Sequence, residues 1–109
     1  MILSQVNKRF DATGSSKMGT LEIDFDQIIK SFGYPTIVDR CDKTQVEWNI
    51  TFELEDGRKV QSTIYDYTIE GPAELNKVWQ IGGYDPAAAA CINAVVALDK
   101  IGLGWKNAS

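Results

Sequence analysis

The stretch Val46-Glu47-Trp48-Asn49-Ile50-Thr51-Phe52-Glu53 alternates apolar and polar residues over eight positions. This strict period of two is typical of a β-strand with one buried face, because successive side chains of a strand point to opposite faces. Asp56-Gly57 follows the stretch, and this dipeptide between two alternating runs is the strongest short-range signal of a hairpin. The sequence therefore predicts an antiparallel hairpin whose second strand runs from Arg58 to about Tyr67.

The predicted second strand carries aromatic residues on the face opposite the core. Val60, Ser62 and Ile64 share the core face, whereas Tyr65 and Tyr67 point the other way. Large aromatic side chains are better explained by a covered surface than by solvent. A second copy of the chain is the expected cover, so we predict a homo-oligomer.

A short helix is predicted on the N-terminal side of the hairpin. Four apolar residues lie at the helical spacing i, i+3, i+4 and i+7, and they are Phe25, Ile28, Ile29 and Phe32. Asp24 is the expected N-cap, with Gln27 as its capping-box partner. Gly33 provides the left-handed residue that ends a helix. We therefore expect a helix over residues 25–32, preceded by a short half-buried strand containing Leu21 and Ile23.

A longer helix is predicted on the C-terminal side. Residues 77–81 are expected to form a third strand, and the glycine pair Gly82-Gly83 is expected to end it. Asp85 then caps a helix with Pro86 at its first position, a placement that suits the fixed φ of proline. A wide apolar face follows between Cys91 and Ile101.

These elements predict an α+β fold. An antiparallel β-sheet of three to five strands packs on the long C-terminal helix, with the short helix near residues 25–32. The 109 residues are expected to form a single domain over 1–109. Residues 1–17 are expected to be either flexible or an edge strand.

The composition excludes several classes of function. The chain has no histidine and only two cysteines, Cys41 and Cys91, so Ser-His or Cys-His catalysis and a four-ligand zinc site are excluded. A net charge of −4 argues against direct nucleic-acid binding. No signal peptide or membrane span is visible in the sequence. We therefore expect a cytosolic protein that is not an enzyme and needs no metal or cofactor.

Three places have the chemistry of a ligand site, and each has a plain structural alternative. Gly82 and Gly83 precede a helix N-terminus, so they predict either a phosphate-binding turn or a tight turn that needs positive φ. Arg58 could meet a phosphate or belong to a solvated hairpin tip. Asn93 could read a base edge or a ribose, or face solvent. The residues alone leave these alternatives open.

Several short motifs occur in an order that resembles a family of small proteins encoded by bacteriophages and some other viruses. The match covers about residues 20–95. Its motifs are Phe32-Gly33-x-Pro35, Asp42-Lys43, Glu47-Trp48-x-Ile50-x-Phe52, Asp56-Gly57, Thr63-Ile64-Tyr65-Asp66-Tyr67 and Trp79-x-Ile81-Gly82-Gly83. The pattern looks like the Thoeris anti-defence sponges. This chain differs from the family at two places. It has Gln80 where the family commonly has a histidine, and it has Lys100 and Lys106 where the sponges use arginines near the C-terminus.

The resemblance implies a phage-encoded counter-defence protein that acts in the host cytoplasm. Such a sponge binds a cyclic nucleotide immune signal, of the cyclic ADP-ribose type or a cyclic oligonucleotide, and sequesters it without turnover. The base would stack on Trp79 or Tyr84. The candidate ligand-binding residues are therefore Arg58, Trp79, Gly82, Gly83, Tyr84 and Asn93.

Two other classes remain open. The first is an anti-CRISPR or similar protein–protein inhibitor that docks on a host defence protein through an acidic face. The second is a phage protein with a structural role only. A concave site with aromatic and arginine side chains would favour the sponge, whereas a flat acidic patch would favour the inhibitor.

Overall fold

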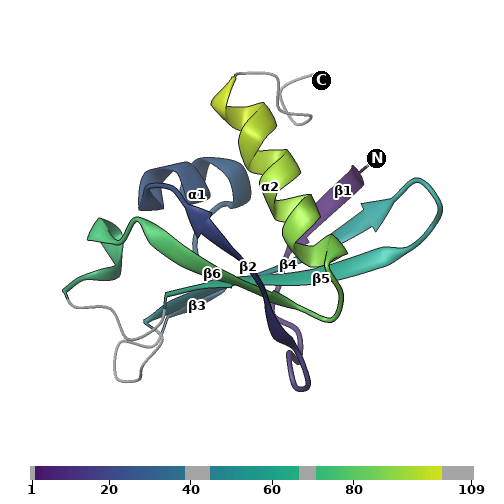
Figure 1. The fold of residues 1–109 in the computed structure, drawn as a ribbon, viewed down its shortest axis with the longest axis horizontal. Coiled ribbons are helices and arrows are strands. Elements are labelled where there is room, and N and C mark those ends of the chain that lie inside the picture. The colour runs from purple at the N-terminus through teal and green to yellow at the C-terminus, as the bar shows by residue number, and fades with distance from the viewer. Residues whose placement is uncertain (1, 39–44, 67–70, 102–109) are drawn as a thin grey trace.

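The computed structural model describes residues 2–38, 45–66 and 71–101 of the chain (Figure 1). Its strands are β1 (Ile2–Asn7), β2 (Ser16–Glu22), β3 (Ile37–Val38), β4 (Val46–Leu54), β5 (Lys59–Tyr65) and β6 (Val78–Gly83). Its helices are α1 (Phe25–Phe32), α2 (Ala87–Lys100) and the short 3₁₀ turn η1 (Ala73–Leu75).

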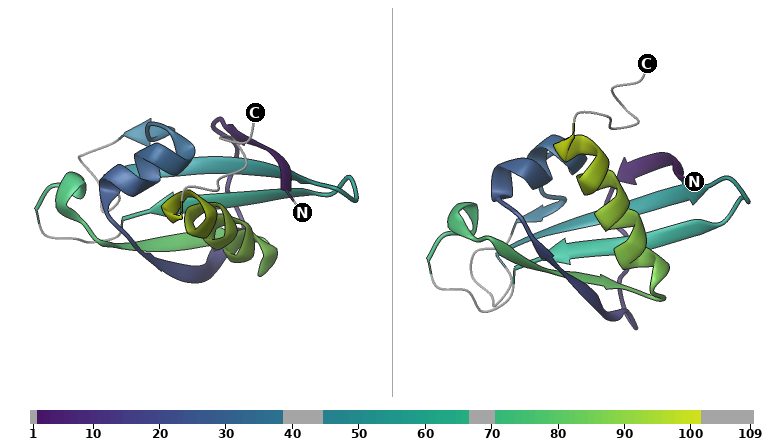
Figure 2. Two further views of the ribbon diagram at one scale, coloured as in Figure 1. Left: turned by 90° about the horizontal axis from the view of Figure 1, so that it is seen from above. Right: turned by 45° about the horizontal axis from the view of Figure 1, so that its top comes forward.

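The described strands form one antiparallel sheet in the order β1-β4-β5-β6-β2, and β3 pairs with β4. Both α-helices lie on the same face of this sheet (Figure 2). The predicted α+β fold is confirmed, including the bounds of α1. The sheet has six strands rather than three to five, because β3 is too short to produce an alternating pattern. Of the two alternatives for the N-terminus, the structure shows the edge strand, β1.

The β4–β5 hairpin forms as the alternating pattern predicts. Trp48 lies opposite Ile64, and the turn closes with a hydrogen bond of 2.9 Å from the Leu54 N–H to the Arg58 carbonyl oxygen. Gly57 has a φ of 86°, a conformation that glycine adopts without a steric penalty. The dipeptide that predicted the hairpin therefore supplies the backbone geometry of its turn.

Two tryptophans occupy the centre of the core between the sheet and the helices. The rings of Trp48 and Trp79 meet edge to face, with centroids 5.4 Å apart and planes at 82°. Both side chains are fully buried, and each indole N–H has a partner. Trp48 donates to the Gly33 carbonyl oxygen at 2.9 Å and Trp79 to that of Ile23 at 3.0 Å. Both indole N–H groups are therefore buried without losing a hydrogen bond.

The two helix starts differ in how well the sequence predicted them. The predicted capping box of α1 is wrong, because the Asp24 side chain makes no capping bond and its carboxylate lies 3.7 Å from the Lys77 ammonium. Gln27 instead donates to the Ser31 hydroxyl, one turn further on. At α2 the predicted cap is off by one residue, because the helix begins at Ala87 and Pro86 is its N-cap, although the Asp85 carboxylate accepts the Ala87 N–H at 2.6 Å.

Residues 8–15, which we call the crossover segment, join the two edge strands β1 and β2. Three strands lie between these edges, so β1 and β2 are about 19 Å apart at the usual strand spacing, and eight extended residues reach about 27 Å. The segment runs along the sheet face opposite the helices. There the Lys8 N–H donates to the Asn49 carbonyl oxygen, and the Phe10 N–H donates to the Asn49 side chain at 3.3 Å. Asn49 is consequently buried.

The crossover segment also covers part of the second sheet face, where the sequence suggested that a partner subunit would be needed. The half-buried Tyr65 lines a shallow hollow together with Ala12 and Ser15 of that segment. Tyr67, the other tyrosine of the argument, lies outside the described residues. A homo-oligomer therefore stays a prediction. Of the two tyrosines that led to it, Tyr65 is partly covered by residues of the same chain.

Candidate functional site: a groove beside helix α2

The predicted stacking residue Trp79 is part of the core. Its side chain is 0 % exposed, and its ring packs against Trp48. A ligand could reach it only if the core opened, so Trp79 does not provide a stacking surface in the folded chain. Its position on β6, next to the polar Gln80, did not distinguish a buried ring from an exposed one.

Gly82 and Gly83 are buried residues of β6 and form no turn. Gly82 lies between Thr63 and Lys17 of the neighbouring strands. Gly83 lies between Ser62 and Ser16 of the same strands. The described glycines with positive φ are Gly14, Gly33, Gly57 and Gly71. Neither the phosphate-binding turn nor the positive-φ turn is therefore present.

Close packing explains the glycine pair instead. A Cβ atom on Gly82 would lie 2.5 Å from the Thr63 hydroxyl oxygen, and one on Gly83 would overlap the Ala88 side chain of α2. The Ser62 hydroxyl, on the neighbouring strand, donates to the Ala88 carbonyl oxygen at 3.0 Å. The glycines thus let the first turn of α2 approach the sheet closely.

The remaining predicted residues lie in separate places. Tyr84 is exposed, and its hydroxyl group lies 3.1 Å and 3.0 Å from the carbonyl oxygens of Asp11 and Thr13. Asn93 is exposed on α2 and donates to the Ala89 carbonyl oxygen of its own helix. Arg58 borders a different cavity, described next. The six predicted residues therefore do not form one pocket.

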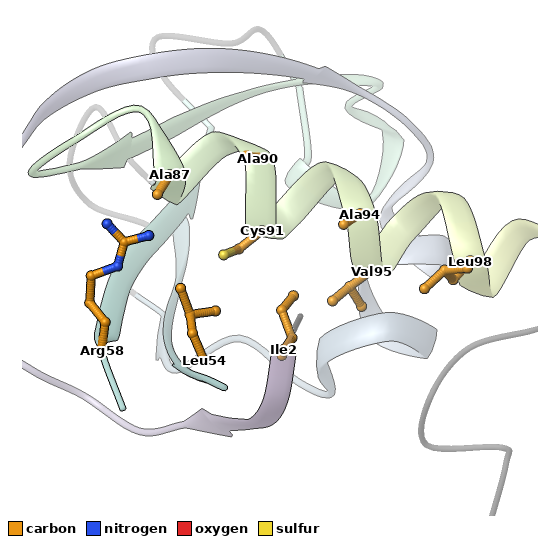
Figure 3. A pocket seen from close by; sticks show the side chains of 9 residues that line it. All are labelled: Ile2, Leu54, Arg58, Ala87, Ala90, Cys91, Ala94, Val95 and Leu98. Atoms are coloured by element: carbon orange, nitrogen blue, oxygen red, sulfur yellow. The ribbon is translucent and has the colours of Figure 1, made fainter. Parts of the chain in front are cut away.

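A groove of about 400 Å³ runs between α2 and the sheet edge made by β1 and the β4–β5 hairpin. We call it the α2 groove (Figure 3). Eight of its nine lining residues are apolar or weakly polar, and the ninth is Arg58. The nine are Ile2, Leu54, Arg58, Ala87, Ala90, Cys91, Ala94, Val95 and Leu98.

Helical spacing brings the α2 residues of this groove together. Ala87, Ala90, Ala94 and Leu98 recur every three or four residues, so their side chains lie along one side of the helix. The alanines have short side chains and leave room in front of the helix. Ile2 and Leu54 form the opposite wall (Figure 3). Of the nine groove residues, the sequence had given Arg58 alone as a candidate ligand residue, and it had placed Cys91 on the apolar face of the helix.

One positive charge stands at the end of this apolar groove. The Arg58 side chain is exposed, and it forms no hydrogen bond or ion pair with any residue that the structure describes. Its field reaches the groove floor, where it acts to lower the pKa of the Cys91 thiol. Burial outweighs that effect and, with a smaller contribution from Asp85, raises the pKa of Cys91 above its usual value.

The raised pKa of Cys91 leads to a prediction about its reactivity. Thiols react as thiolates, so Cys91 in a Cys41→Ser background is expected to react with a small uncharged alkylating reagent at pH 7.5 more slowly than the same protein unfolded in guanidinium. The rate should rise with pH up to a higher midpoint than that of the unfolded chain. Equal rates in the folded and unfolded protein would contradict the burial of this thiol.

Known proteins give no further guide to the site. No known protein family matches this chain, and neither a curated protein sequence nor a solved structure shows significant similarity to it. None of the helices in the described part of the chain is long and apolar enough to cross a membrane. The described residues therefore form an α+β fold with an apolar groove beside α2, and the function has to be argued from that geometry.

Proposed function

We propose that this protein works by binding a ligand without turning it over, and that the α2 groove is the binding site. The observation that supports the proposal is an apolar groove with one cation at its end, which pairs with no residue in the described part of the chain. Sites for small molecules commonly have volumes of about 300–1,000 Å³, apolar walls and few polar groups that fix orientation. At about 400 Å³, the α2 groove has all three features.

The lining of the groove supports binding rather than catalysis. Cys91 is the one nucleophile among the nine lining residues, and its raised pKa keeps the thiol protonated at neutral pH. No carboxylate that could act as a base is among those nine residues. Sequestration without turnover suits the counter-defence role in a phage-infected host cell that the resemblance implies, and that role remains part of the proposal.

The same lining favours an apolar ligand over a nucleotide. No aromatic side chain is among the groove residues, so a base would have no ring to stack on. A nucleotide would also place polar base edges and phosphates against alanine, valine and leucine. Each polar group that loses water without a new partner costs about 1–3 kcal/mol.

A matched pair of α2 variants tests the proposed site. The neutral dye N-phenyl-1-naphthylamine, which fluoresces in apolar surroundings, is expected to bind the parent protein. Ala94→Phe should fill the groove and weaken dye binding at least about tenfold, the scale of one 1.4 kcal/mol loss. Asn93→Phe, on an exposed position outside the groove, should bind the dye like the parent. If the parent does not bind the dye, or if Ala94→Phe binds it normally, the proposed site is wrong.

A second candidate is nucleotide binding at the other predicted aromatic residue. Tyr84 lines a hollow of about 320 Å³ together with Lys59 and Gln61, which combines a ring, a cation and a carboxamide. Its hydroxyl is held by the crossover segment, so the ring is fixed in place. A cyclic nucleotide panel studied by calorimetry should then contain a binder, and Tyr84→Ala should weaken it about tenfold to a hundredfold, the value of stacking one base. Absence of any binder at millimolar concentration would exclude this candidate.

The acidic face expected of a protein inhibitor is interrupted in the structure. Glu53 lies opposite Lys59 across the hairpin, so negative and positive charges are adjacent. Arg58 follows Asp56 by two residues, so a positive side chain lies next to that carboxylate in the chain, and the backbone N–H of Arg58 donates to it. The anti-CRISPR type of function would therefore have to use a mixed surface rather than a uniform acidic patch, and it is the less favoured proposal.

A further inference from the structure

We infer that the α2 groove takes a linear amphiphile, with its single carboxylate at Arg58 and its unbranched apolar chain along α2 toward Leu98. This inference rests on the proposed function and specifies the class of ligand. It follows from the shape of the groove, from the position of its one charge and from the groups around that charge.

The groove is elongated along the helix. From Ala87 to Leu98, the first and last lining residues of α2, the helix rises about 16.5 Å. A volume of about 400 Å³ spread over that length leaves a mean cross-section of about 24 Å². That section suits one extended hydrocarbon chain, whose atoms contact wall atoms at about 4 Å on each side. A compact ligand of the same volume would leave part of this length empty.

The charge stands at one end of this length. Figure 3 shows Arg58 beside Ala87, and Leu98 at the far end of the row. Between them the lining is alanine, cysteine, valine, leucine and isoleucine, which offers nothing to a second polar group. A guanidinium binds a carboxylate with two parallel hydrogen bonds. The arrangement therefore matches a molecule with one anionic end and an apolar remainder.

The start of α2 does not offer a second anion site. The Ala87 N–H already donates to the Asp85 carboxylate at 2.6 Å, and the Ala88 N–H donates to the Asp85 carbonyl oxygen at 3.1 Å. The Asp85 carboxylate also adds a negative charge close to this end, as its effect on the Cys91 pKa shows. A ligand with one negative charge is favoured over a doubly charged phosphate, because each added charge meets that repulsion.

Three probes with the same ten-carbon chain separate the contribution of the head from that of the chain. Decanoate, 1-decanol and decyltrimethylammonium are used below their micelle-forming concentrations to displace N-phenyl-1-naphthylamine from the protein. Decanoate is expected to bind up to about fivefold more tightly than decanol, since an ion pair with the exposed Arg58 guanidinium contributes about 0.2–1 kcal/mol. The cationic probe should bind least.

Variants of two neighbouring cations test the role of Arg58. Arg58→Gln should bring decanoate to the affinity of decanol and leave decanol unchanged. Lys59→Gln removes the adjacent charge, which is exposed and does not line the groove, and should retain the parent's preference. A preference that survives Arg58→Gln, or disappears in Lys59→Gln, would overturn the assignment of Arg58.

The dependence of affinity on chain length tests whether the apolar chain lies along α2 toward Leu98. Each added methylene should tighten carboxylate binding about fourfold, from about 0.8 kcal/mol per buried CH₂, until the chain reaches Leu98. If the dye binds and the three probes displace it with equal affinity, this inference is wrong, while the proposed groove is unaffected. A carboxylate affinity that does not change with chain length would overturn it too. No binding of the dye at all would overturn the proposed function itself.

Discussion

Trp48→Ala is expected to reduce the free energy of unfolding by about 3–5 kcal/mol, the usual cost of removing a buried tryptophan or phenylalanine. Trp48 is fully buried at the centre of β4, and its ring meets that of Trp79 edge to face. The substitution leaves a cavity between the sheet and both helices. It also removes the donor that satisfies the Gly33 carbonyl oxygen at the end of α1. Both losses act on the same core.

Urea unfolding followed by far-ultraviolet circular dichroism measures this effect. In thermal unfolding followed by the same signal, the melting temperature should fall by about 12 °C or more, given about 4–8 °C per kcal/mol for a domain of this size. Trp48→Phe is the matched control, because it keeps an aromatic ring. It loses the N–H donor but only part of the side-chain volume. It should lie between the parent and the alanine variant. An alanine variant that melts within two or three degrees of the parent would show that Trp48 is not in the core.

Gly83→Ala is expected to cost about 3 kcal/mol, the upper part of the usual range for overpacking. The added Cβ would overlap the Ala88 side chain, and the next closest atom is the Gln61 carbonyl oxygen, 3.2 Å away. Strand β6 is held by a partner strand on each side and α2 by its contact with the sheet. Neither element can move away without breaking sheet pairing or opening the core, so relaxation of the structure would itself cost free energy.

Ala88→Gly provides the control for this prediction. Alone, it should destabilise α2 by about 1 kcal/mol or somewhat more, because glycine is a poor helix former. Combined with Gly83→Ala, it removes the overlapping methyl group. The double variant should therefore be more stable than Gly83→Ala alone, and the two changes should be strongly non-additive. Additive losses in urea unfolding would mean that the overlap with Ala88 is not what requires glycine at this position.

The parts of the fold that follow from local patterns were predictable from the sequence. The hairpin turn rests on the alternation of residues 46–53 and on Gly57, both of which depend on neighbours in the chain. The bounds of α1 follow from four apolar residues at helical spacing. Strand β3 escaped prediction, because two residues such as Ile37 and Val38 cannot show a period. Its position is set by pairing with β4.

The candidate site was not predictable in the same way, because it depends on residues far apart in the chain. The α2 groove needs Ile2, the hairpin at Leu54 and Arg58, and one side of α2. No local pattern connects these segments. The glycine pair Gly82 and Gly83 misled for a related reason. Glycine is used both for positive φ and for close approach, and the positions of Thr63 and Ala88 in the folded chain show that close approach is the reason here.

The crossover segment also has a consequence for how the chain folds during its synthesis. Strands β1 and β2 leave the ribosome first, but their partners β4 and β6 extend to residue 83. At about 5–20 residues per second, residues 23–83 take about 3–12 s to translate. The β4–β5–β6 meander can then form from neighbouring segments, as local pairing is fastest. Until β4 is made, β1 has no strand to pair with, and β2 has none until β6 is made, so both present unpaired backbone groups to which a chaperone could bind.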